Sequence, residues 1–341
     1  MGKKTKRKFK KLKVTLIIVA VVVVGIFALR IINGSRFYTE VTKLGSYAAG
    51  TKMEAYPLAQ EGVTVTPIKS NYTNGFHMAP DEKSKPGVIV YFGGSDGGVD
   101  FDHSVALAKK GYEVVSLFYF GQENQPENYN KVPLEFFGEF LDYAETAGIE
   151  LSPLTVVGIS KGSELSLLLA NHYEEIDNVV LYAPSSYVFQ GGDMMARTSS
   201  WTYEGEELPY INLLPDFFGV VKLYAPMIIN CPIAFRDFQH NMIRKADNAQ
   251  EARIDVSNFT GNILAFAGAD DQVWPSDMMG QMIKDAAPEQ TELVIYPDAG
   301  HAFVPIVNVM GMQNGGTIEG NTKAQVDSDA KLTEFLTNHH K

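Results

Sequence analysis

The sequence has a single cysteine, Cys231, among 341 residues, and this scarcity excludes several classes of protein. One thiol allows no intramolecular disulfide, so the chain is not a scaffold built on disulfides. No Cys or His residues recur at metal-ligand spacing, and no G-x-G-x-x-G segment is present, so we expect neither a metal nor a dinucleotide cofactor. With 45% hydrophobic and 20% charged residues, the chain is also neither disordered nor collagen-like.

The body of the chain lacks net positive charge. The formal net charge is −11, but residues 1–13 hold eight lysines and arginines and no acidic residue, so the rest of the chain carries −19. A nucleic-acid binder usually shows a basic face on its folded domain. We therefore expect no nucleic-acid partner, and we interpret residues 1–13 as a basic stub.

An apolar run follows the basic stub directly. Residues 14–29 carry no charge, and Ile31 and Ile32 continue the run after Arg30, which can extend to lipid headgroups. A bilayer core needs about 20 apolar residues, so residues 14–32 predict one transmembrane helix that anchors the chain in the lipid bilayer. A cleaved signal peptide and a buried core helix are the alternatives, but the run is long for a signal core and no small-x-small cleavage site follows. The positive-inside rule places residues 1–13 in the cytoplasm and the body outside it.

Two regions follow the predicted span. Residues 33–61 are polar and mixed and predict a stalk or linker, whereas residues 62–341 predict one domain. In that domain short β-branched runs alternate with amphipathic stretches, which favours a mostly parallel α/β sheet with helices on both faces. The expected strands cover residues 63–68, 76–78 (after an Asn74-Gly75 turn), 87–92, 113–118, 154–158, 178–182, 262–267 and 293–296. The expected helices cover residues 104–110, 133–146, 161–172, 276–286 and 324–339.

Residues 184–261 interrupt this alternation. The interval is too long for an ordinary loop and therefore predicts a lid insertion with structure of its own. We expect most of its large apolar residues to fill a small core within the insertion, and a minority to line an acyl pocket. These residues are Met194, Met195, Trp201, Tyr203, Tyr210, Phe217, Phe218, Tyr224, Phe235 and Phe238.

A G-x-S-x-G motif spans residues 158–162 and places Ser160 between an expected strand and an expected helix. Glycines permit the tight turn that exposes such a serine, and the helix N-terminus directs N–H groups toward developing negative charge. Ser160 is therefore the predicted nucleophile. A serine in an ordinary strand-to-helix turn is the alternative.

A serine nucleophile needs a base that is held by a carboxylate. The order Ser, Asp or Glu, His is typical of strand-elbow-helix nucleophiles, and His301 follows the last expected strand. We predict His301 as the base, with His240 as a weaker choice. Asp270 and Asp271 follow the strand over residues 262–267, at the sheet edge where α/β proteins build their sites, and we prefer Asp271.

The oxyanion hole needs two backbone N–H donors. Lys161, directly after the nucleophile, is expected to supply one. The glycine-rich segment over residues 93–98 follows the strand ending at Phe92, and either Ser95 or Asp96 is expected to supply the second.

Together these segments resemble the C-terminal catalytic domain of the acyl-CoA thioester hydrolase / bile acid-CoA:amino acid N-acyltransferase family. The resemblance rests on FGGSDGG (92–98), LAKKGYEVVSLFYFG (107–121), GISKGSELSL (158–167), WTYEGEELPY (201–210), GADDQVWPS (268–276) and YPDAGHAF (296–303). It implies an α/β-hydrolase fold with a Ser160–Asp271–His301 triad.

Three departures from the family pattern refine the expected function. Acyltransferase members use cysteine as nucleophile, so Ser160 favours transfer to water. Animal members also carry an N-terminal β-sandwich domain, for which the segment between the span and the core is too short. An extracytoplasmic site would meet few CoA esters. We thus expect a membrane-anchored serine hydrolase of a small-molecule acyl ester or thioester, the alternatives being a peptidase or amidase, or a catalytically silent binding module. The sequence carries no signal for oligomeric state.

Overall fold

The computed structural model describes residues 3–37, 49–193, 195–213, 217–309 and 311–341. Within these residues nine strands form one sheet in the order β1-β2-β3-β5-β4-β7-β8-β11-β12. The strands are β1 (Ala59–Gln60), β2 (Val63–Lys69), β3 (Asn74–Pro80), β4 (Val88–Phe92), β5 (Val114–Phe118), β7 (Leu154–Ile159), β8 (Asn178–Tyr182), β11 (Asn262–Gly268) and β12 (Thr291–Tyr296).

The sheet is antiparallel from β1 to β5 and parallel from β5 to β12. All five residues of β4 and the first five of β7 are buried, because helices cover both faces of a parallel sheet. The expectation of a mostly parallel α/β sheet with helices on both faces is therefore confirmed.

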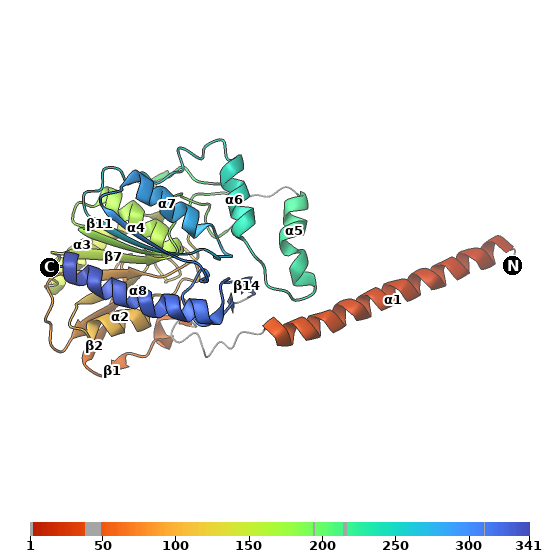
Figure 1. Cartoon of the computed structure of the whole chain (residues 1–341), viewed down its shortest axis with the longest axis horizontal. Helices are drawn as coiled ribbons and strands as arrows, with labels where there is room; N and C mark the ends of the chain where they lie inside the picture. The colour runs from red at the N-terminus through yellow and green to blue at the C-terminus, as the bar shows by residue number, and fades with distance from the viewer. Residues whose placement is uncertain (1–2, 38–48, 194, 214–216, 310) are drawn as a thin grey trace.

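Two groups of helices cover the two faces (Figure 1). One face packs against α3 (Phe136–Ala147), α4 (Lys161–His172) and α7 (Ser276–Ala286), with Phe137, Leu165 and Ile283 in the shared core. The other packs against α2 (Phe101–Ala108) and α8 (Ile318–His339) through residues that include Phe101 and Phe335. The parallel strands therefore direct their carboxyl ends to one edge between these layers.

Two expectations about the segment before β4 are wrong. Asn74 and Gly75 do not form a turn but lie inside β3, and the chain reverses earlier, where Ser70 N donates to Thr73 O at 2.9 Å. The stalk expected over residues 33–61 is also shorter than predicted: α1 (Lys3–Phe37) includes residues 33–37, and η2 (Met53–Ala55) and β1 belong to the folded body. Met53 and Tyr56 are buried in its core, while residues 38–48 lie outside the described part.

The lid insertion, residues 184–261, has structure of its own, as the interval length indicates. It contains β9 (Trp201–Tyr203), β10 (Glu206–Glu207), α5 (Phe217–Ile228) and α6 (Arg236–Lys245), and β9 also pairs with β6 (Val132–Pro133). The last short pair, β13 (Asn308–Val309) and β14 (Met312–Gln313), follows β12.

The insertion has a separate core, as expected, but the residues that form it are not the predicted ones. This core contains Tyr187, Phe189, Ile211 and Ile243 of the insertion. Trp274 and Met279, from outside the insertion, complete it. By contrast, Trp201 is fully buried in the main core, and Tyr203 and Tyr210 pack against it. Met195 and Phe218 are 83% and 80% exposed, and Met194 lies outside the described residues.

Helix α1 extends away from the body (Figure 1). It is the one helix among the described residues that is long and apolar enough to cross a membrane. Residues 14–32 alone would extend about 28 Å as a helix, close to the roughly 30 Å thickness of a hydrocarbon core. Large apolar side chains along this stretch are exposed, so the body does not cover them.

Candidate active site

Ser160 lies in a strained turn between β7 and α4. Its φ of 54° is a conformation that side chains rarely adopt, and Ser160 N donates to Tyr182 O of the neighbouring strand at 2.8 Å. The glycines on either side of Ser160, Gly158 and Gly162, are required because backbone atoms lie very close to them. A Cβ on Gly158 would lie 2.1 Å from Gly162 O, and one on Gly162 would lie 2.4 Å from Gly93 O. The motif therefore forms the turn that exposes the serine hydroxyl.

His301 lies between Ser160 and Asp271. Its Nε2 is 2.8 Å from Ser160 Oγ, and its Nδ1 is 2.9 Å from Asp271 Oδ2. The three residues follow β7, β11 and β12, so their loops emerge at the carboxyl edge of the sheet although 141 positions separate Ser160 from His301. Both distances are within hydrogen-bonding range, which allows a proton to pass from the hydroxyl to the imidazole.

Asp271 is completely buried and fully engaged by donors. Its Oδ1 accepts the backbone N–H groups of Val273 at 2.8 Å and Trp274 at 3.1 Å, and its Oδ2 accepts Ser276 Oγ at 2.6 Å as well as contacting His301. These bonds fix the direction of the carboxylate. Asp271 is therefore placed to orient the imidazole.

Asp270 points elsewhere. Its Oδ1 accepts Gln272 Nε2 at 2.6 Å and its Oδ2 accepts Gly316 N at 2.8 Å, and the residue is exposed. It therefore holds the loop that carries Gly316 rather than the histidine. His240 lies on α6 of the lid insertion, and the histidine hydrogen-bonded to Ser160 Oγ is His301.

The loop that carries His301 is fixed by Asn314. His301 N donates to Asn314 O at 2.8 Å, and the Asn314 side chain accepts from Ala302 N at 2.7 Å and donates to Ala302 O at 3.1 Å. The Trp274 ring meets the imidazole edge-on, with 5.7 Å between centroids. Sequence reasoning missed Asn314, and only its position in the segment after β14 could have drawn attention to it.

The glycine-rich loop after β4 lies against the nucleophile. A Cβ on Gly94 would lie 3.7 Å from Ser160 Cβ, and Gly94 O accepts the Tyr119 hydroxyl at 2.8 Å and Gly97 N at 3.2 Å. Ser95 and Asp96 are thus the central residues of a turn beside Ser160. Lys161, the first residue of α4, follows Ser160 directly. The segments expected to form an oxyanion hole therefore adjoin the nucleophile.

A buried ion pair supports the start of α4. Lys161 Nζ lies 2.7 Å from Glu164 Oε1, and both side chains are almost fully buried. Trp201 Nε1 and Phe189 N donate to the same oxygen at 2.7 and 3.1 Å, and Lys161 lies over the ring of Tyr129 with 5.5 Å to its centroid. Burial lowers the pKa of Lys161 and raises that of Glu164.

The roles of Glu164 and Trp201 were not predicted, although both lie inside segments that carry the family resemblance, GISKGSELSL and WTYEGEELPY. Together they connect the lid insertion to the helix that follows Ser160. No group of three or more His, Cys, Asp or Glu side chains that could hold a metal ion occurs among the described residues.

The sheet order, the strained serine turn and the Ser160–His301–Asp271 line are features of the α/β hydrolases. A solved structure of this fold, the acylaminoacyl peptidase of Pyrococcus horikoshii, aligns with a TM-score of 0.53 over 82% of this chain and 42% of its own, at 13% identity. At that identity the similarity concerns the fold alone.

The chain belongs to the family described as BAAT / Acyl-CoA thioester hydrolase C terminal, whose model matches residues 132–341. The predicted family is confirmed. The chain is 26% identical to human acyl-coenzyme A thioesterase 6 over 295 residues and 25% identical to mouse bile acid-CoA:amino acid N-acyltransferase over 301 residues. Each alignment covers 82% of this chain and 66% of the relative, so the chain spans slightly less than two thirds of their length.

Proposed function

We propose that this protein is a membrane-anchored serine hydrolase that cleaves acyl esters or thioesters through an acyl-enzyme. The observation that carries this proposal is the hydrogen-bonded line from Ser160 Oγ through His301 to the buried Asp271. Family membership supports the same chemistry, since relatives bear the names of acyl-coenzyme A thioesterases.

The geometry suits a two-step reaction. Ser160 Oγ attacks the acyl carbonyl while His301 Nε2 takes the hydroxyl proton, and Asp271 holds the imidazole and stabilises its positive charge. The oxyanion would accept N–H groups from Lys161 and from Ser95 or Asp96. The bond from the acyl carbon to the leaving oxygen or sulfur then breaks, and the imidazolium returns its proton to the leaving group. His301 next deprotonates a water molecule, whose oxygen attacks the acyl carbon. The bond from that carbon to Ser160 Oγ breaks, the acid is released, and the imidazolium returns its proton to Oγ.

Transfer to water is favoured over transfer to an amine because the nucleophile is serine. An extracytoplasmic site also favours esters or thioesters other than those of CoA. This second argument depends on topology. Eight cations precede the apolar stretch of α1 and only Arg30 and Arg36 lie near its other end, which favours a cytoplasmic position for residues 1–13.

The reaction is tested with the full chain in detergent, using esters, CoA thioesters and amides of graded acyl length. We expect turnover of activated esters and thioesters, and Ser160→Ala should lower it by at least about 10³-fold. Ser257→Ala, at an exposed position, is the matched control. Preference for amides would indicate a peptidase or amidase. Absence of turnover together with no fluorophosphonate labelling of Ser160 would indicate a silent binding module.

The topology is tested separately by protease digestion of intact cells that express the chain with a C-terminal tag. Digestion of the tag from outside is expected. A tag that stays protected until the cells are opened would contradict the proposed orientation without bearing on the chemistry.

A further inference from the structure

Helix α5 of the lid insertion exposes apolar side chains that the body does not cover. Its sequence, FFGVVKLYAPMI, carries one charge, Lys222. Phe218 is 80% exposed, Ile228 56% and Val221 49%, and Val220 and Met227 are exposed as well. Soluble proteins rarely leave such contiguous apolar surface in water, so this face is expected to have a partner.

The exposed residues cover about half of the circumference of the helix. At about 100° per residue, Phe218, Val221 and Ile228 project about 140–160° away from Leu223, while Val220 and Met227 border the Leu223 side. Leu223 is 7% exposed and, with Gly219 and Pro226, faces α6 across a cavity of about 330 Å³. The helix therefore packs on the insertion with one side only. Lys222 is exposed and lies between the apolar face and the cavity, which it also lines, so its amine can extend to a polar layer.

The C-terminal end of α5 is bonded to the body end of α1. Arg30 Nη1 donates to Met227 O at 3.0 Å and Ile228 O at 3.1 Å, and Asn33 Nδ2 donates to Ile229 O at 2.7 Å. The last carbonyls of a helix lack partners within it, and here Arg30, near the end of the apolar stretch of α1, donates to two of them. Wherever α1 leaves a bilayer, α5 is held at that level.

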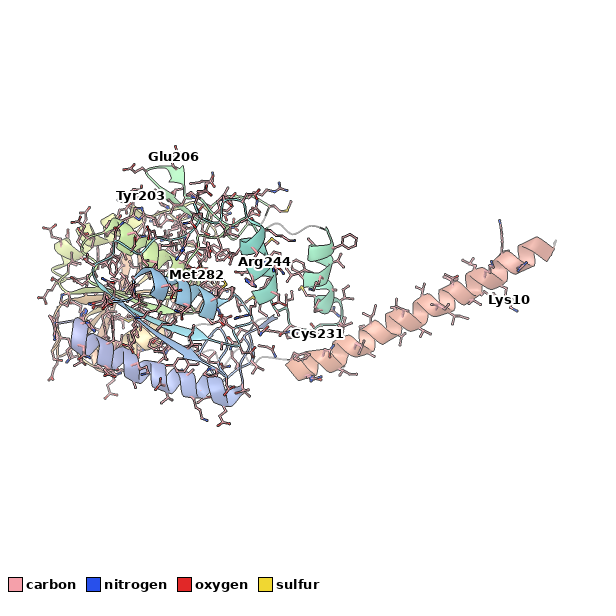
Figure 2. All side chains as sticks on the ribbon, turned by 45° about the horizontal axis from the view of Figure 1, so that its top comes forward. Lys10, Tyr203, Glu206, Cys231, Arg244 and Met282 are labelled. Carbon is pink, nitrogen blue, oxygen red and sulfur yellow. The ribbon has the colours of Figure 1, made fainter. Side chains whose placement is uncertain are left out.

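The direction of α5 fits a helix that lies in the plane of a membrane. In both views it runs across the direction of α1 rather than along it, at the side of the body from which α1 extends (Figures 1 and 2). Figure 2 shows Cys231, just beyond α5, near the body end of α1, whereas Lys10 lies near its far end.

We propose that α5 is an interfacial helix that lies in the outer leaflet of the bilayer spanned by α1. Its exposed apolar face contacts the acyl chains, and Lys222 reaches the phosphate layer. The bilayer is the occupant because the end of α5 is bonded to the body end of α1, whose own apolar surface is uncovered, and because Arg30 fixes both helices at one depth. The proposal rests on the membrane anchoring proposed above.

Docking of α5 would also hold the lid insertion against the membrane. Helix α6, on the other side of the cavity, is tied to the loop of the triad acid: Arg236 donates to Asp271 O at 3.1 Å and pairs with Asp277 at 2.8 Å. The insertion thus connects the membrane surface to the edge of the site.

Lipid depth measurements on the full chain test the proposal. In a Cys231→Ser background, single cysteines replace Val221 on α5, Val22 within the predicted span, and Val326, a 66% exposed valine on α8 that serves as the matched control. Each carries a nitrobenzoxadiazole label and is reconstituted in phosphatidylcholine vesicles with and without doxyl-labelled lipid. Hydrolysis of a soluble short-chain ester reports that each variant has folded.

Labels at positions 22 and 221 should be quenched several-fold more than the label at 326. Adding Phe218→Asp should reduce quenching at 221 and leave it unchanged at 22. Quenching at 22 but not at 221 would overturn the docking of α5 and leave the anchor intact. Absence of quenching at 22 would overturn the anchor and the docking together, whatever the hydrolytic activity.

Discussion

Trp201 Nε1 donates a 2.7 Å hydrogen bond to Glu164 Oε1, and through it the lid insertion is joined to the helix that begins beside Ser160. The same oxygen balances the buried Lys161 ammonium. Because Lys161 is also expected to donate its backbone N–H to the oxyanion, this buried cluster connects the packing of the insertion to the geometry of the site.

Glu164→Gln should lower the free energy of unfolding by about 3–5 kcal/mol, because it leaves the Lys161 charge buried without a counter-charge. The amide oxygen can still accept from Trp201, so loss of that bond would not account for the effect. Urea unfolding of the detergent-solubilised chain, followed by fluorescence of the two tryptophans, measures it.

The double variant Lys161→Met with Glu164→Gln is the matched control for this pair. Removing the charge as well should restore most of the lost stability, since neutral side chains of similar volume are tolerated at buried ion pairs. A double variant as unstable as Glu164→Gln alone would contradict the ion-pair explanation.

Asp271→Asn and Asp270→Asn form a second pair of variants. Asp271→Asn should lower kcat by about 10³–10⁴-fold, since an amide at this position no longer stabilises the imidazolium or selects its tautomer. Asp270→Asn should change kcat less than about threefold, because Asp270 contacts Gln272 and Gly316 rather than His301. Equal losses in both variants would contradict the assignment of Asp271. Steady-state hydrolysis of one activated ester measures both.

Gly162→Ala should disrupt the serine turn. The added Cβ would meet Gly93 O at 2.4 Å and Phe92 O at 2.6 Å, and backbone atoms of a central strand cannot yield at low cost. We expect a loss of stability of roughly 1–3 kcal/mol and a larger proportional loss of kcat.

Gly138→Ala in α3 is the comparison for Gly162→Ala. Its Cβ would meet only the Tyr173 side chain, at ordinary contact distances of 3.6 Å to the hydroxyl and 3.9 Å to Cε1, so the helix preference of alanine should raise stability by up to about 1 kcal/mol. Urea midpoints and ester turnover of the two variants, measured side by side, distinguish a steric effect from a general effect of the substitution.

Because His340 is buried, we expect the stability of the protein to depend on pH. Burial lowers its pKa to about 4, while its ring bonds Thr155 Oγ1 at 2.8 Å and Pro86 O at 2.9 Å. The unfolded chain, with an ordinary pKa near 6.5, binds the proton more readily, so stability is full above about pH 6.5 and falls as the pH decreases toward 4.

The shift corresponds to about 3 kcal/mol over that interval. His340→Gln keeps one donor and one acceptor but does not titrate, so its unfolding free energy should fall less between pH 7 and pH 4. Urea unfolding at several pH values gives both curves. Parallel curves for the two proteins would rule out His340 as the source of the dependence.

Much of the framework was predictable because its causes are local. The helices over residues 161–172 and 276–286 form with the expected bounds, and the serine, acid and histidine each follow a buried strand that the sequence marks clearly. Gly75 shows where local patterns mislead. Glycine is required at this position by a close contact and not by a turn, because a Cβ there would lie 2.0 Å from Ser116 O of the adjacent strand.

Other parts depend on contacts between distant segments. The bond from Trp201 to Glu164 joins residues 37 positions apart, and Arg30 reaches α5 across 197 positions. No periodicity or motif encodes such pairs. For the same reason Trp201 was placed in a core of the insertion, although it lies in the main core beneath it.

The end of the chain just after α8 is fixed to the body. Because His340 is bonded to Thr155 and Pro86, the C-terminus is fixed to the body on the side away from α1 (Figure 1). Under the proposed anchoring, a fluorescent protein fused after Lys341 would thus be carried on the surface of the body farthest from the membrane. Energy transfer from such a fusion to a dye in the bilayer would report the height of the whole domain above the lipid, and hence any tilting of the body during turnover.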